Sequence, residues 1–111
     1  AKMIGISRTK NIIMRGKRLS GEEAFQLGIA CEVVEKSELE NMTNKIVKEL
    51  LGVSPLAQRT IKSVLNATQN ATLHTSIDLE GEAYGRLRSS NDFKEGVKSF
   101  SEKRHPSYKG N

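Results

Sequence analysis

The chain has one Cys and two His, the residues of a possible Cys–His nucleophile pair or His-containing metal site: Cys31, His74 and His105. A nucleophilic Cys–His pair would need Cys31 beside one of the two histidines. Cys31 lies in an apolar stretch, which favours a buried and inert thiol. The histidines are far apart in sequence and lack helical i, i+4 spacing, so they make a poor metal site. We therefore expect no metal site and no catalytic residue here.

Two further motifs could be read as catalytic or phosphate-binding. Glu22 and Glu23 are neighbouring carboxylates of the type used in general-base catalysis. They lie in the first turn of an expected helix, where negative charge complements the helix dipole, and this favours a structural role. Gly16-Lys17 lacks the earlier glycine of a phosphate-binding P-loop, and no strand leads into it. Neither motif predicts catalysis.

The elements that must position any site are helices, because apolar residues recur with helical spacing along the whole chain. We predict a mainly α fold of five or six helices with at most one short strand. The strand candidate is Ile29–Val34, which is rich in β-branched and apolar residues. The expected helices cover residues 4–15, 21–27, 37–51, 55–65, 73–87 and 91–104.

Helix starts and stops are marked by capping residues. Ser20 with Glu23, and Ser37 with Glu40, have the spacing of a capping box. Ser54 precedes Pro55, which is typical of an N-cap followed by the first helical position. Polar residues 66–72 predict a linker or a frayed helix end. Glycines are expected to end three of the helices: Gly16, Gly28 and Gly52.

The apolar content is low, at 36% of 111 residues, so we expect one domain with a small core. Five residues of the helix over 73–87 are expected to point inward: Leu73, Ile77, Ala83, Tyr84 and Leu87. The apolar faces of two preceding helices are expected to need a partner surface, supplied by self-association: Leu39, Met42, Ile46, Ile61 and Leu65.

Charge is uneven along the chain, whose net charge is +5. Residues 1–20 carry six basic residues and no acidic one, whereas residues 21–50 carry seven Glu against three Lys. Basic ends can attract a polyanion. However, the aromatic residues are not interleaved with the basic ones as stacking on nucleic acid requires, so we expect no nucleic-acid partner. A single Cys fits a reducing compartment, and no apolar run approaches a membrane span. We expect a cytoplasmic protein, or a matrix protein if it is mitochondrial, with no membrane partner.

Five segments, in order and at consistent separations, resemble one family. They are residues 3–24, 27–34, 54–66, 80–97 and 100–110, and the last has Phe100, Glu102-Lys103-Arg104, Pro106, Tyr108 and Gly110 in the pattern F.EKR.P.F.G. Together they resemble the C-terminal part of the crotonase superfamily, the enoyl-CoA hydratase/isomerase proteins. The resemblance covers residues 1–111 and implies a C-terminal helical assembly domain whose N-terminal ββα spiral core lies upstream. Because Ala1 rather than Met opens the chain, we expect such an upstream part.

The resemblance implies an acyl-CoA enzyme, most simply an enoyl-CoA hydratase of fatty-acid oxidation. It acts on a coenzyme A thioester without a covalently bound cofactor. In the family, the thioester oxygen is held by two backbone N–H groups, and the acid/base Glu residues also lie upstream. Hydration needs such donors and a carboxylate that handles water. We therefore expect no catalytic residue in this chain, and no activity from the chain alone.

The resemblance also implies that this part serves assembly and coenzyme A contact. Family members form trimers or dimers of trimers, and their tails reach a neighbouring subunit's ligand. Phe100 would lie near the coenzyme A and Lys103 near its phosphates, since a compact ammonium pairs well with phosphate oxygens. The alternatives are a core Phe100, continuing the stripe of Phe93 and Val97, and a solvated Lys103.

The expected tail is extended, because Pro106 cannot continue a helix. It would leave the last helix near Arg104, free to dock on a neighbour or to move. Two alternative functions remain open. One is a free-standing basic helical interaction module. The other is a different crotonase reaction, such as enoyl-CoA isomerisation, which upstream residues would decide.

Overall fold

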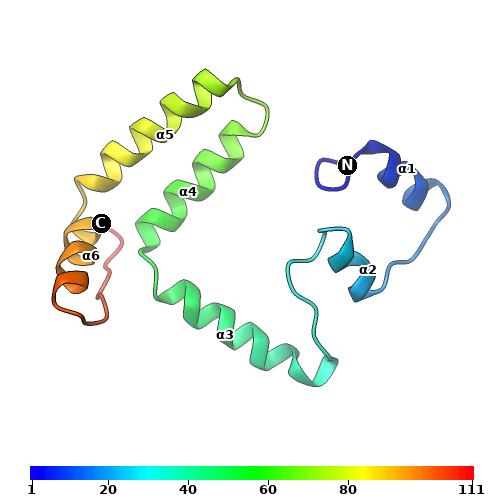
Figure 1. Cartoon of the computed structure of the whole chain (residues 1–111), viewed down its shortest axis with the longest axis horizontal. Helices are drawn as coiled ribbons and strands as arrows, with labels where there is room; N and C mark the ends of the chain where they lie inside the picture. The colour runs from blue at the N-terminus through cyan, green and yellow to red at the C-terminus, as the bar shows by residue number, and fades with distance from the viewer. The chain divides into compact units, whose positions relative to one another are not determined.

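A computed structural model describes all residues 1–111 and contains six α-helices, one 3-10 turn and no strand (Figure 1). This confirms the prediction of a mainly α chain. The contacts group into two compact units, Ala1–Thr43 and Asn44–Asn111, each of which is described by itself. The elements are α1 (Ile6–Met14), α2 (Gly21–Gln26), η1 (Lys36–Glu38), α3 (Leu39–Leu51), α4 (Pro55–Thr68), α5 (Leu73–Arg88) and α6 (Asn91–Ser101).

In the first unit, α1 and α2 both end as predicted, and α2 also begins at its predicted cap, whereas α1 begins after Gly5 with no side-chain cap. Each ends at a glycine with positive φ, Gly16 at 58° and Gly28 at 70°, a conformation that a residue with a Cβ adopts at a cost. The Ser20 hydroxyl accepts the Glu23 N–H at 3.1 Å, and the Glu23 carboxylate accepts the Ser20 N–H at 2.8 Å. The capping box is therefore confirmed.

The predicted strand at 29–34 is wrong. These residues are irregular, and the N–H groups of Ile29 and Ala30 both donate back to the Ala24 carbonyl at the end of α2. A strand needs a neighbouring strand to complete its ladder, and this chain has none. The predicted burial of Cys31 fails for the same reason, because its thiol is exposed.

The second predicted capping box, Ser37 with Glu40, is also wrong. A 3-10 turn precedes α3, and it starts before the serine, since the Glu38 N–H donates to the Glu35 carbonyl at 2.9 Å. Ser37 therefore lies inside the turn rather than at its cap. The end of α3 agrees with the prediction, because the helix stops at Leu51 and the Gly52 N–H donates to the Lys48 carbonyl.

In the second unit, three helices begin at hydroxyl N-caps. Ser54, Thr72 and Ser90 each accept an N–H from three residues further along the chain, at 3.1, 3.2 and 3.1 Å. A short loop joins α4 to α5, which lie side by side and run in opposite directions, and α5 also contacts α6 (Figure 1). Residues 66–72 were predicted to be a linker or a helix end, and they are both, because α4 continues to Thr68 and a loop follows.

Few side chains are buried, which confirms the expected small core. Ala83 is the only buried apolar residue, whereas three buried residues are polar: Ser54, Asp92 and Ser99. On α5 the inward prediction is wrong for Leu73, Ile77 and Tyr84, which are 77%, 57% and 56% exposed. The packing of α4 against α5 covers only one side of the helix, and these three residues have no neighbour to cover them in this chain.

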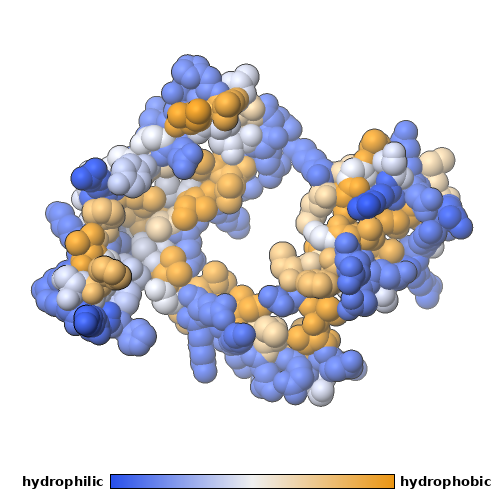
Figure 2. All heavy atoms as spheres, in the orientation of Figure 1, coloured by the Kyte–Doolittle hydropathy of each residue, from blue (hydrophilic) through white to orange (hydrophobic).

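The apolar faces of α3 and α4 are open, as predicted. Apolar side chains reach the surface along α4 (Figure 2). Ile61 and Leu65 of α4 are 52% and 62% exposed, Leu39 of α3 is 60% exposed, Ile46 lies near one-third exposure at 36%, and Met42 is half-buried. No helix of the chain is long and apolar enough to cross a membrane.

Candidate functional site

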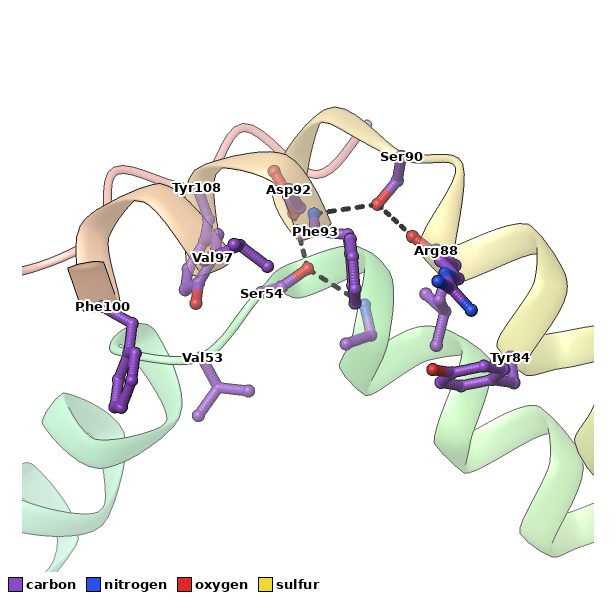
Figure 3. Close-up of a pocket in the computed structure, with 13 residues that line it drawn as sticks. Val53, Ser54, Tyr84, Arg88, Ser90, Asp92, Phe93, Val97, Phe100 and Tyr108 are labelled. Atoms are coloured by element: carbon purple, nitrogen blue, oxygen red, sulfur yellow. Dashed lines mark hydrogen bonds between the residues drawn. The ribbon is translucent and has the colours of Figure 1, made fainter.

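The most buried carboxylate of the chain joins three segments of the second unit. Asp92, in the first turn of α6, is 4% exposed. It accepts the Ser54 hydroxyl at 2.5 Å (Figure 3). It also accepts the N–H groups of Lys109 and Gly110, at 2.8 and 3.1 Å. Its own N–H donates to the Asn111 carbonyl at 3.0 Å. The start of α4, the start of α6 and the tail are thus fixed to one side chain.

Asp92 holds its charge in this position. Burial alone would raise the pKa of its carboxyl, but the hydrogen bonds from the Ser54 hydroxyl and from the tail N–H groups outweigh burial and lower the pKa. A charged acceptor strengthens each of these hydrogen bonds. The group is therefore a structural anchor, ionised at neutral pH.

A second carboxylate, one turn further along the same face of α6, also fixes the tail. Glu95 accepts both terminal nitrogens of Arg104, at 2.6 and 3.0 Å, and the Ser107 N–H at 2.8 Å. The Arg104 Nε also donates to Glu102 at 2.7 Å. The Arg104 side chain and the Ser107 N–H lower the pKa of Glu95 to about 2, and the same carboxylates raise the pKa of Arg104.

The tail therefore differs from its prediction in one respect. It leaves α6 after Ser101 and is irregular from His105 onward, as expected from Pro106, but it docks on its own helix. Tyr108 lies against Gly96, where an added Cβ would approach the Tyr108 hydroxyl to 3.2 Å. The absence of a side chain at Gly96 lets the tail lie close to α6.

A hollow of about 550 Å³ lies beside this anchor in the second unit (Figure 3). Its wall is mostly apolar and aromatic, and its polar members are Asp92, Ser54, Ser90 and Arg88. Residues from α4, α5, α6 and the tail all contribute to it: Ala57, Tyr84, Leu87, Phe93, Val97, Phe100 and Tyr108.

Phe100 occupies the outer end of this hollow. It projects from the last turn of α6, away from Asp92 and Ser54, and is 87% exposed (Figure 3). It therefore does not continue a buried stripe with Phe93 and Val97, which are themselves 39% and 57% exposed. The core interpretation of Phe100 is wrong for this chain, and its ring is free to contact another molecule.

Lys103 lies directly after α6 in a left-handed turn with φ 53°. Its N–H donates to the Phe100 carbonyl at 3.2 Å, and the Arg104 N–H donates to the Ser99 carbonyl at 3.0 Å. This pair of bonds is the Schellman motif that ends many helices. The two residues that the sequence singles out for coenzyme A contact are thus parts of one turn.

The other sequence candidates hold structural positions. The pKa of Glu23 is lowered, first by the Ser20 N–H and then by its hydroxyl, within the capping box. Glu22 accepts the Gln26 side-chain amide at 2.9 Å. His74 lies 3.6 Å from Asp78 at the exposed start of α5. No group of three or more His, Cys, Asp or Glu side chains is arranged to hold a metal ion.

Sequence reasoning missed the roles of Asp92 and Glu95. The sequence places Asp92 and Glu95 in the family segment 80–97 without indicating a role for either, and it predicts Ser54 only as a helix cap. One usable signal was the order of residues, with two acidic positions on one helix face followed by Arg104 and an extended tail that is long enough to fold back. The partner N–H groups, 17 and 18 residues from Asp92, have no local signature.

Comparisons with known proteins agree with one another. The family profile described as enoyl-CoA hydratase/isomerase matches residues 1–111. A trans-2-decenoyl-[acyl-carrier-protein] isomerase of Streptococcus mutans is 35% identical over 109 residues, covering 98% of this chain and 41% of the relative. A short-chain-enoyl-CoA hydratase of Clostridium acetobutylicum is 29% identical over 104 residues, covering 94% and 40%.

Solved structures show the same fold. An enoyl-CoA hydratase from Bacillus anthracis superimposes with a TM-score of 0.94 and 34% identity, over 99% of this chain and 43% of that one. The chain spans about two-fifths of the length of the curated relatives that it matches.

The carboxylate anchors predict how the tail responds to acid. Because the folded pKa of Glu95 is about 2 against an ordinary 4.5, its contribution to stability is full above pH 4.5 and is lost as the pH falls through about 2. The lowered pKa of Asp92 acts in the same direction. In an NMR titration, the amide signals of Ser107 and Gly110 should keep their neutral-pH positions until the pH is well below 4.5.

The control is Glu95→Gln, in which the Ser107 signal should lose its acid transition while the Gly110 signal keeps one. Release of the Ser107 amide already near pH 4.5, or of the Gly110 amide already near pH 3.8, the ordinary pKa values of a Glu and an Asp carboxyl, would contradict the anchors.

Proposed function

Because the chain belongs to the enoyl-CoA hydratase/isomerase family, we propose that it is the C-terminal helical part of an enzyme that adds water to a 2-trans-enoyl-CoA. The observation that carries this proposal is the family match over every residue of the chain. The same match favours an enzyme part over a free-standing interaction module. The similarity to the hydratases of Clostridium acetobutylicum and Bacillus anthracis supports the choice of reaction.

The C-terminal placement rests on the order of motifs and on coverage. The last segment, from Phe100 to Gly110, resembles the family's closing pattern, and the chain spans about two-fifths of its relatives. An upstream ββα core would supply the oxyanion donors and the catalytic Glu. Within this chain, Glu23, Asp92 and Glu95 are engaged by the chain's own N–H, hydroxyl and guanidinium groups. They are not placed to activate water.

The end of α6 would contact coenzyme A. Phe100 offers an exposed ring, and Lys103 follows it in the same turn with an exposed side chain. A ring can cover an apolar or heteroaromatic part of the ligand, and an ammonium pairs with phosphate oxygens. Because these groups lie outside the second unit's buried anchor, a ligand can reach them without disturbing Asp92.

Assembly is the second proposed role. The open faces of α3 and α4, with Leu39, Ile61 and Leu65 more than half exposed, would be covered by the upstream core or by other subunits of a homo-oligomer. The family resemblance implies a trimer. Apolar burial of this kind supplies the free energy that the small core lacks.

Double-bond isomerisation is the second candidate reaction. It is favoured by one observation: the relative with 35% identity is named a trans-2-decenoyl-[acyl-carrier-protein] isomerase. Both reactions need stabilised negative charge on the thioester oxygen, and they differ in which carboxylates handle the proton or the water.

The first prediction of this proposal concerns activity. A longer protein that carries this chain behind its N-terminal core should hydrate crotonyl-CoA, seen as loss of the absorbance of the conjugated thioester, whereas the 111-residue chain alone should not. Glu23→Gln in the longer protein should leave turnover unchanged, because Glu23 caps α2.

If the longer protein isomerises a non-conjugated enoyl thioester but does not hydrate crotonyl-CoA, the proposed reaction is isomerisation and not hydration. Activity of the chain alone, lost in Glu22→Gln or Glu23→Gln, would refute the placement of the catalytic groups.

The second prediction concerns Lys103. In the longer protein, Lys103→Ala should raise the KM for an acyl-CoA by roughly tenfold and leave turnover nearly unchanged, because a charge-assisted phosphate contact contributes about 1–2 kcal/mol to binding. An enoyl thioester of N-acetylcysteamine, which lacks the nucleotide, should not respond. Lys94→Ala, which removes an exposed ammonium elsewhere on α6, is the matched control. An equal response of both substrates would show that Lys103 is structural.

A further inference from the structure

Lys103 is the only residue with positive φ in the chain that is not a glycine. At this position after a helix, glycine is the usual residue, because a Cβ makes the left-handed conformation unfavourable. The other positive-φ residues are Gly5, Gly16, Gly28 and Gly110. Unfavourable backbone conformations persist where surrounding contacts fix them, and they concentrate at functional positions. Contacts with neighbouring residues must therefore fix this turn.

Two kinds of contact hold the turn: backbone hydrogen bonds within it and side-chain contacts between Arg104 and Glu95. The Lys103 and Arg104 N–H groups bond to the carbonyls of Phe100 and Ser99. The Arg104 guanidinium is then held by both oxygens of Glu95, at 2.6 and 3.0 Å. Past the turn, the Ser107 N–H donates to the same carboxylate at 2.8 Å. Glu95 thus contacts the chain one residue and four residues after Lys103.

The pairing of Arg104 with carboxylates also determines which cation of the turn a ligand can bind. Arg104 donates to Glu95 and to Glu102, so its charge is neutralised by carboxylates. Lys103, one residue earlier, has no such partner. The pair lies at the surface, with the Glu95 side chain 22% exposed and that of Arg104 38% exposed, and its two hydrogen bonds give it a fixed geometry. An incoming phosphate therefore meets Lys103 as the free cation of the turn.

We propose that Glu95 is a positioning residue for acyl-CoA binding, which holds Arg104 and Ser107 and so fixes the turn that presents Lys103 and Phe100 to the ligand. This inference rests on the proposed coenzyme A contact. Glu95 itself does not touch the ligand. A two-point carboxylate–guanidinium pair fixes the direction of the Arg104 side chain, which one hydrogen bond would not do. The backbone on each side of Lys103 is thereby held before the ligand arrives.

The test is a double-mutant cycle in the longer protein, with crotonyl-CoA and the N-acetylcysteamine thioester as the two substrates. Glu95→Gln should raise the KM for crotonyl-CoA by up to the factor seen for Lys103→Ala, on the order of tenfold, without changing turnover. It should leave the short thioester unaffected. The double variant should be no worse than Lys103→Ala alone, because Glu95 acts through Lys103.

Two further variants keep the test decisive if Glu95→Gln folds poorly. Arg104→Lys keeps the charge but loses the two-point pair, and it should reproduce the Glu95→Gln effect. Lys103→Gly relieves the left-handed backbone and removes the ammonium, so it should raise KM as Lys103→Ala does while unfolding at a higher temperature than Lys103→Ala. Circular dichroism of each variant checks that helix content is kept.

The outcomes separate this inference from the function on which it rests. If Lys103→Ala raises KM but Glu95→Gln and Arg104→Lys do not, the coenzyme A contact stands and the positioning role is refuted. Additive effects of Glu95→Gln and Lys103→Ala, or an equal loss with both substrates, would also refute it. If Lys103→Ala and Lys103→Gly themselves change nothing, the proposed coenzyme A contact fails first.

Discussion

The carboxylate of Asp92 accepts hydrogen bonds from two segments that lie far from it in sequence, Ser54 at the start of α4 and the N–H groups of Lys109 and Gly110. The second unit depends on this group. Its buried residues include one apolar side chain, Ala83, against three polar ones, so apolar packing within the chain cannot by itself fix the order of α4, α6 and the tail. A buried charge is tolerated because each oxygen has donors.

The position of the tail decides what the end of α6 can do. Because Asp92 and Glu95 hold residues 104–110 along α6, the turn at Lys103 is closed, and Phe100 is left on the outer end of the hollow. The apolar face of α4 is uncovered as well, since Ile61 and Leu65 are 52% and 62% exposed. Polar contacts thus give the unit its internal geometry, and its apolar surface remains for other parts of an assembly.

Local features of the fold could be predicted from the sequence, and non-local ones could not. The helix ends at Gly16 and Gly28 and the capping box at Ser20 depend on residues within one turn, and the prediction of each is confirmed. The strand at 29–34 and the burial of Cys31 depend on a neighbouring strand, which the apolar pattern alone does not guarantee. The roles of Asp92 and Glu95 depend on where an irregular tail docks. The open faces of α3 and α4 were predicted because the family resemblance implies an upstream part that such faces would meet.

We infer that polar anchors hold the second unit together and that a partner covers its apolar helix faces. Sedimentation equilibrium of the full 111-residue chain over a wide concentration range tests it most directly, beside Leu65→Glu, which places a charge on a residue that is 62% exposed. We expect the chain to self-associate as its concentration rises, and Leu65→Glu to suppress association while helix content is unchanged. A chain that stays monomeric at every concentration, and unfolds cooperatively, would contradict the account.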